Sequence, residues 1–230
     1  MKIKNSVVII TGSSSGIGLA TARLLVLKGA MVVLAARSAV KLKKLEKEIP
    51  NSFAVPTDMR KPADIKSLVK KTMKKYGRVD ILINNAGQGM RASVEKININ
   101  DYKSVMDLNV FGVLQAMQAV IPIMRKQGGG MILNVSSMVS KNYFPWMAAY
   151  ASTKYALNAL TLTARTELEP DHIVVSVFYP KKTSTDFGAN ALGEKYSSSA
   201  GRPGMIADTP ESVAKAIIEQ LESEATEANM

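Results

Sequence analysis

The sequence predicts an α/β fold in which one parallel sheet carries helices on both of its faces. Three observations predict it. Short β-branched runs alternate with longer stretches of helical periodicity along the chain, which is typical of successive β–α–β units. The strand-like runs are almost continuously apolar, as expected for strands covered on both faces. No internal repeat or linker divides the 230 residues, so we expect a single domain.

Six apolar runs are predicted to form the sheet: 7–10, 31–34, 53–55, 79–83, 131–135 and 173–178. Predicted helices cover 16–28, 40–49, 62–76, 101–125, 149–169 and 210–221. In the second helix leucines fall on one side and lysines elsewhere, an amphipathic pattern. Pro62 and Gly77 mark the start and end of the third helix. The longest uncharged stretch, 108–124, contains Asn109 and Pro122, which favours a buried helix over a membrane span.

Regular periodicity stops after Pro180. Residues 183–204 are rich in Gly, Ser and Ala, and such a stretch inside a compact domain is typical of a lid or binding loop. We therefore expect a lid at about 183–205 within a domain covering residues 1–222. The polar, acidic residues 223–230 are expected to form a flexible, frayed tail.

Composition excludes several classes of site. The chain has no cysteine and one histidine, which excludes disulfides and thiolate sites and disfavours a histidine metal site or a Ser-His-Asp triad. No metal site is expected.

The net charge of +11 suggests either a polyanionic partner or a solvated lysine surface. The helical spacing of the lysines favours the second. Without a targeting signal, we expect a cytoplasmic protein with no membrane or nucleic-acid partner.

A glycine-rich loop joins the first predicted strand to the first helix. Its spacing, Gly12-x3-Gly16-x-Gly18, differs from the Gly-x-Gly-x2-Gly fingerprint, but it lies in the strand-to-helix context that supports such a motif. Glycines there let a pyrophosphate approach the free N–H groups of the helix. A dinucleotide-binding loop is therefore predicted, and a tight turn without a ligand is the alternative.

Arg37 ends the second predicted strand, about twenty residues beyond the loop, where an acidic residue would favour NAD and an arginine NADP. Because no carboxylate is adjacent, NADP(H) is favoured over NAD(H); alternatively, Arg37 only solvates the strand end. Asp58 follows the third strand. It could bond an adenine amine or be an ordinary loop aspartate.

Tyr150 and Lys154 are four residues apart in a predicted helix and so share a face. A nearby ammonium group lowers the pKa of a phenol, which suits a general acid or base. Ser137 ends the fifth strand, where its hydroxyl could hold a carbonyl oxygen beside the tyrosine. Asn109 lies in an apolar helix and needs partners. It either solves a local backbone problem or positions a water or Lys154.

Together these motifs make the chain resemble the short-chain dehydrogenase/reductase family, including its 3-oxoacyl carrier-protein reductases and carbonyl reductases. The resemblance runs from Lys4 to about Pro180. It rests, in order, on the loop 11–18, Asn84-Asn85-Ala86-Gly87, Asn109, Ser137 and Tyr150-x3-Lys154. It implies a Rossmann-type doubly wound sheet, hydride transfer between a nicotinamide and a carbonyl or alcohol carbon, and a homodimer or homotetramer.

The resemblance also implies roles for single residues. Ser137 would orient the carbonyl, Tyr150 would donate the proton, Lys154 would lower the tyrosine pKa and bind the nicotinamide ribose, and Asn109 would support a water relay. The cofactor contacts implied are Gly12, Ser14, Ser15, Gly16, Ile17, Gly18, Arg37, Asp58, Met59, Asn85, Ala86, Gly87, Tyr150, Lys154, Pro180, Thr183 and Thr185. The substrate contacts expected are Gln88, Ser137, Met138, Met147, Lys181 and Phe187.

The residues expected to flank the carbonyl also include Met90 and residues 144–147. With these the set is mostly apolar and lacks a carboxylate, which favours a hydrophobic ketone, aldehyde or 3-oxoacyl compound over a sugar. One departure from the family pattern is Lys181, which follows Pro180 where the family has glycine. Its ammonium group could extend into solvent or reach an anionic group. Two other functions stay open: a dinucleotide-binding regulator without turnover, and a basic nucleic-acid binder, although no aromatic residues are interleaved with the lysines.

Overall fold

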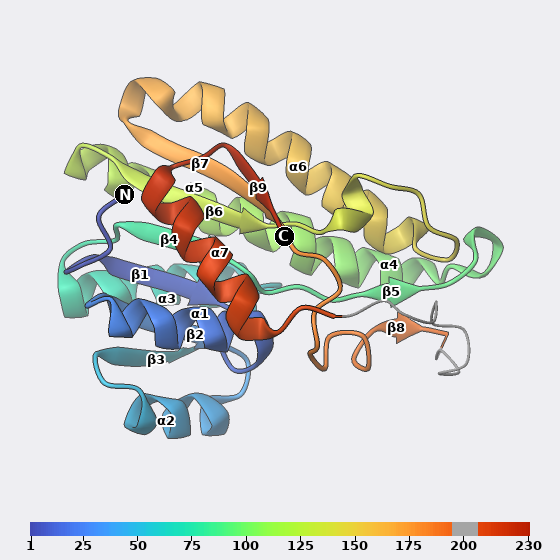
Figure 1. Cartoon of the computed structure of the whole chain (residues 1–230), viewed down its shortest axis with the longest axis horizontal. Coiled ribbons are helices and arrows are strands. Elements are labelled where there is room, and N and C mark those ends of the chain that lie inside the picture. The colour runs from blue at the N-terminus through green and yellow to red at the C-terminus, as the bar shows by residue number, and fades with distance from the viewer. Residues whose placement is uncertain (195–206) are drawn as a thin grey trace.

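The computed structural model describes residues 1–194 and 207–230. In these residues seven parallel strands form one sheet in the order β3-β2-β1-β4-β6-β7-β9 (Figure 1). The chain first adds strands on one side of β1 and then on the other, which is the doubly wound arrangement. The strands are β1 (Val7–Thr11), β2 (Met31–Ala36), β3 (Ser52–Pro56), β4 (Ile81–Asn84), β6 (Gly130–Val135), β7 (Ile173–Tyr179) and β9 (Glu227–Asn229).

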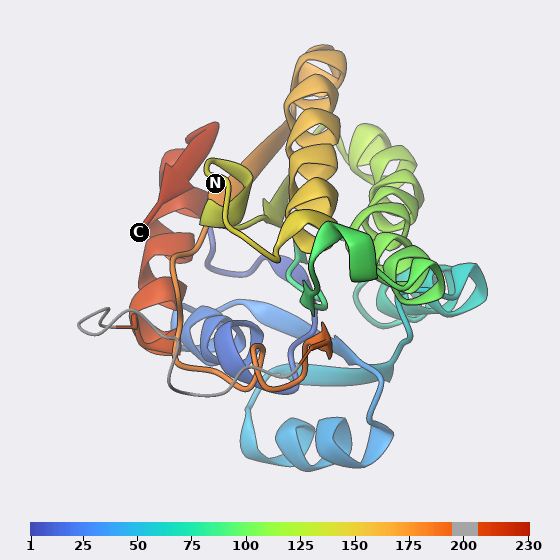
Figure 2. The same cartoon turned by 90° about the vertical axis from the view of Figure 1, so that its right-hand side faces the viewer.

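Helices cover both faces of the sheet (Figure 2). Alternate residues of each strand point to opposite faces, so Val8 and Ile10 enter one core while Val7 and Ile9 enter the other. The first core is closed by α1 (Gly16–Leu27), α2 (Ala39–Glu48) and α7 (Pro210–Ser223). The second is closed by α3 (Pro62–Tyr76), α5 (Gly112–Gln127) and α6 (Ala148–Leu168). The predicted fold class is confirmed.

The helix predicted at 101–125 is longer and less regular than expected. It consists of α4 (Ile99–Met106), a π-helical turn at Asp107–Phe111 and α5. At Gly112 an added Cβ would lie 2.2 Å from the Met59 carbonyl oxygen, so only glycine allows this approach. By length and hydropathy, Ile99–Gln127 is able to cross a membrane. In this structure, however, Val113 and Val120 are buried against the sheet.

The expectation of a frayed tail is wrong for Glu227–Asn229. These residues form β9, which pairs in parallel with β7, Val177 opposite Glu227. The Gln220 side chain fixes the turn before the strand, because its amide donates to the carbonyl oxygens of Val177 and Ala225, both at 3.0 Å. Strand pairing uses backbone hydrogen bonds and does not require apolar side chains. The polar tail therefore has no apolar pattern from which the strand could be predicted.

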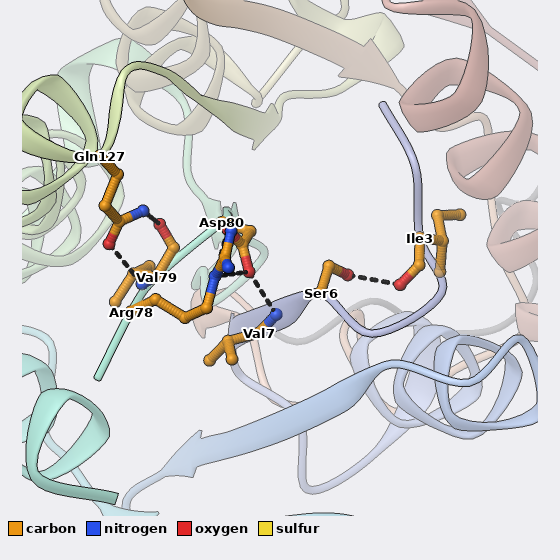
Figure 3. A network of polar contacts seen from close by, with 7 residues as sticks. All are labelled: Ile3, Ser6, Val7, Arg78, Val79, Asp80 and Gln127. Carbon is orange, nitrogen blue, oxygen red and sulfur yellow. Dashed lines mark hydrogen bonds and ion pairs between the residues drawn. The ribbon is translucent and has the colours of Figure 1, made fainter. Parts of the chain in front are cut away.

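A buried carboxylate joins the strands at the edge where β1 and β4 begin (Figure 3). Asp80 is 8% exposed and accepts a hydrogen bond of 2.8 Å from the backbone N–H of Val7. Its other partner is the Arg78 guanidinium, at 2.6 to 2.9 Å. Gln127, at the end of α5, pairs with both backbone groups of Val79. This network fixes the starts of two central strands relative to each other.

We predict that Asp80→Ala lowers the free energy of unfolding by about 2 to 3 kcal/mol, because the buried Val7 N–H loses its acceptor. Urea denaturation monitored by circular dichroism measures the loss. The control is Asp171→Ala, which removes the surface ion pair with Arg125 and should cost little. Equal losses in the two variants would contradict the role given to Asp80.

Candidate active site

Many of the residues that the sequence singled out follow the carboxyl ends of parallel strands, and those ends meet at one edge of the sheet. The glycine loop follows β1, and Arg37 follows β2. Asp58 and Met59 come after β3. The remaining groups follow three further strands: Asn85-Ala86-Gly87 after β4, Ser137 after β6, and Pro180 after β7. Sequence positions far apart are thereby brought to one site.

The glycine loop is packed tightly against the loop after β4. An added Cβ at Gly12 would lie 2.8 Å from the Ala86 Cα, and one at Gly18 would lie 2.5 Å from the Asn85 Nδ2. Gly12 also has φ +68°, in the left-handed region that glycine adopts readily. Thr11 Oγ1 accepts hydrogen bonds from the backbone N–H groups of Asn85 and Ala86, both at 3.0 Å. Close approach of the two loops therefore requires these glycines.

The N-terminus of α1 is suited to bind an anion. The Ser15 side chain, at the N-cap, makes no capping hydrogen bond, so it does not occupy the N–H groups of the first turn. Ser14 and Ile17 are partly exposed beside it. Thr185 approaches from the segment after β7, with its Cγ2 3.0 Å from the position of a Cβ at Gly16. These residues fit the diphosphate of a dinucleotide.

Two cations lie where the sequence predicted the adenosine end. Arg37 is exposed and forms no ion pair within residues 1–194 and 207–230. Asp58 is bound by Arg60, which the sequence analysis missed, at 3.1 Å and 2.9 Å. The Arg60 hydrogen bond holds the pKa of Asp58 below its usual value against the opposing effect of burial, and Arg37 adds a smaller lowering effect. The local signal for this pairing in the sequence is that Asp58 and Arg60 lie two residues apart.

Tyr150 and Lys154 share the inner face of α6 and are 5% and 4% exposed. Lys154 Nζ donates to the carbonyl oxygen of Val135 at 2.8 Å and lies 5.9 Å from the centre of the Tyr150 ring. Burial lowers the pKa of Lys154 to about 8. Burial also raises the pKa of Tyr150, although the hydrogen bond with Ser137 opposes the shift. This net rise differs from the lowering expected from Lys154, because desolvation of the phenolate dominates.

A second set of polar contacts supports Ser137. The Ser140 hydroxyl donates to the Ser137 carbonyl oxygen at 2.6 Å and accepts from Asn158 Nδ2 at 2.9 Å. Asn158 Oδ1 also accepts from the Ser136 hydroxyl at 2.6 Å. The sequence patterns did not point to Asn158 as a site residue, although it lies four residues after Lys154 and so on the same helical face. The turn that carries Ser137 is therefore anchored to α6.

Asn109 lies in the π-helical turn and is fully buried. Its Oδ1 accepts from the Gln88 backbone N–H at 2.9 Å, and its Nδ2 donates to the Gln88 carbonyl oxygen and to Thr153 Oγ1, both at 3.0 Å. Of the alternatives drawn from the sequence, these contacts correspond to the backbone role. An added Cβ at Gly87 would lie 3.4 Å from Asn109 Oδ1 and 3.8 Å from Lys154 Nζ. Gly87 thus leaves space beside both side chains.

The segment after β7 folds back over this site. The Phe187 ring lies 5.6 Å from the Tyr150 ring, centre to centre, at an angle of 54°. Nearby, Gln88 Nε2 donates to the Asn190 carbonyl oxygen at 2.7 Å. The strand β5 (Met90–Arg91) pairs with β8 (Leu192–Gly193). No pattern in the sequence indicates this pairing, because each strand has only two residues.

The other expected substrate and nicotinamide contacts differ in how close they lie to Tyr150. Met147 packs in one cluster with Tyr150. The Met138 N–H donates to the Pro180 carbonyl oxygen at 3.2 Å, which joins two segments at the edge of the site. Thr183 forms a bridge with Asp208, and Lys181 is exposed. The part of the expected lid at 195–205 lies outside the described residues.

Comparisons with known proteins agree with this geometry. The family model for short chain dehydrogenase matches residues 6–195. An uncharacterized oxidoreductase of Staphylococcus saprophyticus is 35% identical over 94% of this chain and 89% of its own. A 3alpha-hydroxysteroid dehydrogenase of Mediterraneibacter gnavus is 33% identical over 95% of this chain and 82% of its own.

Solved structures agree as well. The 3-ketoacyl-(acyl-carrier-protein) reductase of Brucella melitensis, complexed with NADH, has a TM-score of 0.89 at 28% identity and covers 99% of this chain and 98% of its own. The alcohol dehydrogenase of Thermococcus sibiricus, complexed with 5-hydroxy-NADP, has a TM-score of 0.86 at 28% identity and covers 99% and 96%. The chain belongs to the short-chain dehydrogenase/reductase family and is an NAD(P)-dependent oxidoreductase.

Proposed function

We propose that the protein transfers a hydride between NADP(H) and the carbonyl or secondary alcohol carbon of an apolar small molecule, with Tyr150 as general acid and base. The observation that carries the proposal is the grouping of Ser137, Tyr150 and Lys154 at the same edge of the sheet as the glycine loop. A buried phenol bonded to a serine hydroxyl, with a buried ammonium on the next helical turn, is arranged to hold and release a proton.

The cofactor would lie along the carboxyl edge of the sheet. Its diphosphate would bind the uncapped N-terminus of α1 at residues 14–18, and its adenosine would lie near Asp58 and Met59. The exposed guanidinium of Arg37 favours the 2′-phosphate of NADP(H). The nicotinamide half would contact residues 85–87, Pro180, Thr183 and Thr185.

The reduced cofactor supplies the hydride. In the reducing direction, the hydroxyls of Ser137 and Tyr150 would both donate to the carbonyl oxygen, and Tyr150 would transfer its proton to that oxygen. The raised pKa of Tyr150 keeps the phenol protonated at neutral pH. Lys154, with a pKa of about 8, is mostly charged at pH 7 and would stabilise the phenolate as it forms. Asn109 would act indirectly, by fixing the Gln88 backbone and supporting a water relay to Lys154.

The substrate would be a hydrophobic ketone, aldehyde or 3-oxoacyl compound. Phe187 and Met147 lie against Tyr150, and neither carries a charge. The names of two similar proteins, a 3alpha-hydroxysteroid dehydrogenase and a 3-ketoacyl-(acyl-carrier-protein) reductase, support an apolar carbonyl compound. Homo-oligomer formation is part of the proposal, since Ile99 and Phe111 are exposed on one long helix. NADPH oxidation with a panel of such carbonyl compounds tests the reaction, and a regulator without turnover would give none.

We predict that Tyr150→Phe lowers kcat at least about 10²-fold, the scale of general acid catalysis, while NADPH binding survives because ring and helix remain. Steady-state NADPH oxidation and a cofactor titration measure the two effects. The matched control is Tyr155→Phe on the same helix, where the phenol is exposed and stacked on Tyr143. Near-normal turnover in Tyr150→Phe would refute the assignment.

We predict that Arg37→Asp weakens NADPH binding and relatively favours NADH, because a carboxylate repels the 2′-phosphate but accepts from a ribose hydroxyl. The measurement is the ratio of kcat/KM for the two cofactors. Lys41→Asp makes the same charge change on an exposed position of α2, so it controls for the general electrostatic field. A wild-type preference for NADH, or an equal effect of both variants, would count against this role.

We predict that the free energy of unfolding rises between pH 8 and about 10. The folded-state pKa of Lys154 is about 8, against 10.5 for the free side chain, so in this window the unfolded chain binds more protons. The gain is at most about 1.4 kcal/mol per pH unit. Above about pH 10 the raised pKa of Tyr150 acts in the opposite direction.

Lys154→Met should remove this rise, stabilise the protein at pH 7 and abolish activity, because the buried ammonium is lost. Urea unfolding at several pH values measures the effect. Lys66→Met, on the exposed side of α3, should keep the wild-type pH dependence. A wild-type stability that stays flat from pH 8 to 10 would show that Lys154 is not held in this desolvated state.

A further inference from the structure

Trp146 has a backbone conformation that bulky residues avoid. Among the described residues, those other than glycine with positive φ are Asn5, Asn51, Trp146, His172 and Glu224. Asparagine tolerates this region, and His172 and Glu224 each cap the end of a helix, where a left-handed residue is common. Trp146, at φ 68°, caps no helix end and precedes the N-cap of α6. Its conformation therefore needs another explanation.

The fold gains little from a tryptophan at this position. The indole is 50% exposed, so much of its apolar surface stays in water. Within residues 1–194 and 207–230, its ring contact is with Arg91, whose Cζ lies 5.8 Å from the ring centre. The Trp146 carbonyl oxygen accepts a hydrogen bond of 3.0 Å from the Ala92 N–H, but a glycine would supply the same oxygen without backbone strain. Strain that packing does not offset is typical of functional positions.

The position of Trp146 connects it to the active site. The next residue, Met147, packs with Tyr150 in one cluster. Arg91, beside the indole, belongs to β5 and pairs with Gly193 of β8. The same segment after β7 that contains β8 also carries Phe187 against Tyr150. Figure 1 places β5, β8 and the first turn of α6 at one end of the molecule. Trp146 thus directly precedes a residue that packs with Tyr150, and its indole lies beside β5.

We propose that Trp146 is a substrate-binding residue whose indole is covered by a ring of the carbonyl substrate, on the side away from the reacting carbon. This inference rests on the proposed function. An indole presents a large, flat apolar face with few rotatable bonds, which suits a rigid ring more than a polar group. The substrate class is therefore an apolar ketone with at least two fused rings, because a single small ring held at Tyr150 would leave the indole in water.

The sequence allows a direct measurement, because Trp146 is the one tryptophan in the chain. The wild-type protein with NADP⁺ is titrated with 2-decalone, which has two fused rings, and separately with cyclohexanone. We expect the fluorescence of Trp146 to move to shorter wavelength with 2-decalone as the indole leaves water, and to stay unchanged with cyclohexanone. This readout requires no turnover, so it separates the inference from the proposed reaction. An unchanged emission at saturating 2-decalone overturns the inference.

Kinetics of two glycine variants give the second test. Trp146→Gly and His172→Gly each relieve a positive φ, but only the first removes a side chain at the site. We expect Trp146→Gly to raise KM for 2-decalone at least about 10-fold, with KM for NADPH and kcat/KM for cyclohexanone within about twofold of wild type. Its Tm should not fall. His172→Gly should change none of these kinetic constants.

Other outcomes would overturn the inference. An equal loss for both ketones in Trp146→Gly would show that the residue shapes the loop and does not contact substrate. A change in oligomeric state by size-exclusion chromatography would place the indole between two copies of the chain. Trp146→Phe provides the conservative variant, and it should recover part of the affinity for 2-decalone because a smaller aromatic face remains.

Discussion

The loops that follow β1 and β4 touch through backbone atoms, and the arrangement of the site depends on that contact. There is no room for a Cβ at Gly12 or Gly18, and Thr11 and Asn85 bond across the interface. The N-terminus of α1 is therefore held against the end of β4. Since Gly87 follows directly and lies beside Asn109 and Lys154, the N-terminus of α1 and the inner face of α6 that carries Lys154 have a fixed separation.

The inner face of α6 is polar, and most of its groups are satisfied by hydrogen bonds. Thr153 bonds to Asn109, and Asn158 bonds to Ser136 and Ser140. Lys154 differs, because its ammonium group donates to a neutral carbonyl oxygen, that of Val135. An ammonium without a carboxylate partner loses hydration that one carbonyl does not replace, and its pKa falls. Burial of this ammonium group therefore costs folding free energy, and it leaves a cation that is suited to interact with a negative charge.

The two sides of the site are built differently. The proposed cofactor side consists of glycines and hydrogen bonds between central strands, which leave little freedom to adjust. The proposed substrate side consists of two-residue strands, β5 and β8, and of partly exposed aromatic side chains such as Phe187 and Trp146. Contacts of this second kind bury less surface and are easier to change.

The sequence by itself determined six strands of the large sheet, the glycine loop and the common face of Tyr150 and Lys154. These features depend on local periodicity and on spacing along one helix, which the chain specifies within a few residues. The doubly wound class was implied by the family resemblance of the motifs. Only the tertiary structure decided that Glu227–Asn229 form a strand, that Arg60 binds Asp58, and that Phe187 lies on Tyr150.

The direction of the Tyr150 pKa shift also came from tertiary structure, because it depends on how much water the fold removes from the phenol. Spacing along a helix places a cation near the Tyr150 ring, but it does not show how far that ring is shielded from water. The close approach of Gly112, at the end of the π-helical turn, to the Met59 carbonyl oxygen likewise joins segments about fifty residues apart. Contacts at such separation leave no periodic pattern in the sequence, so only the packed chain reveals them.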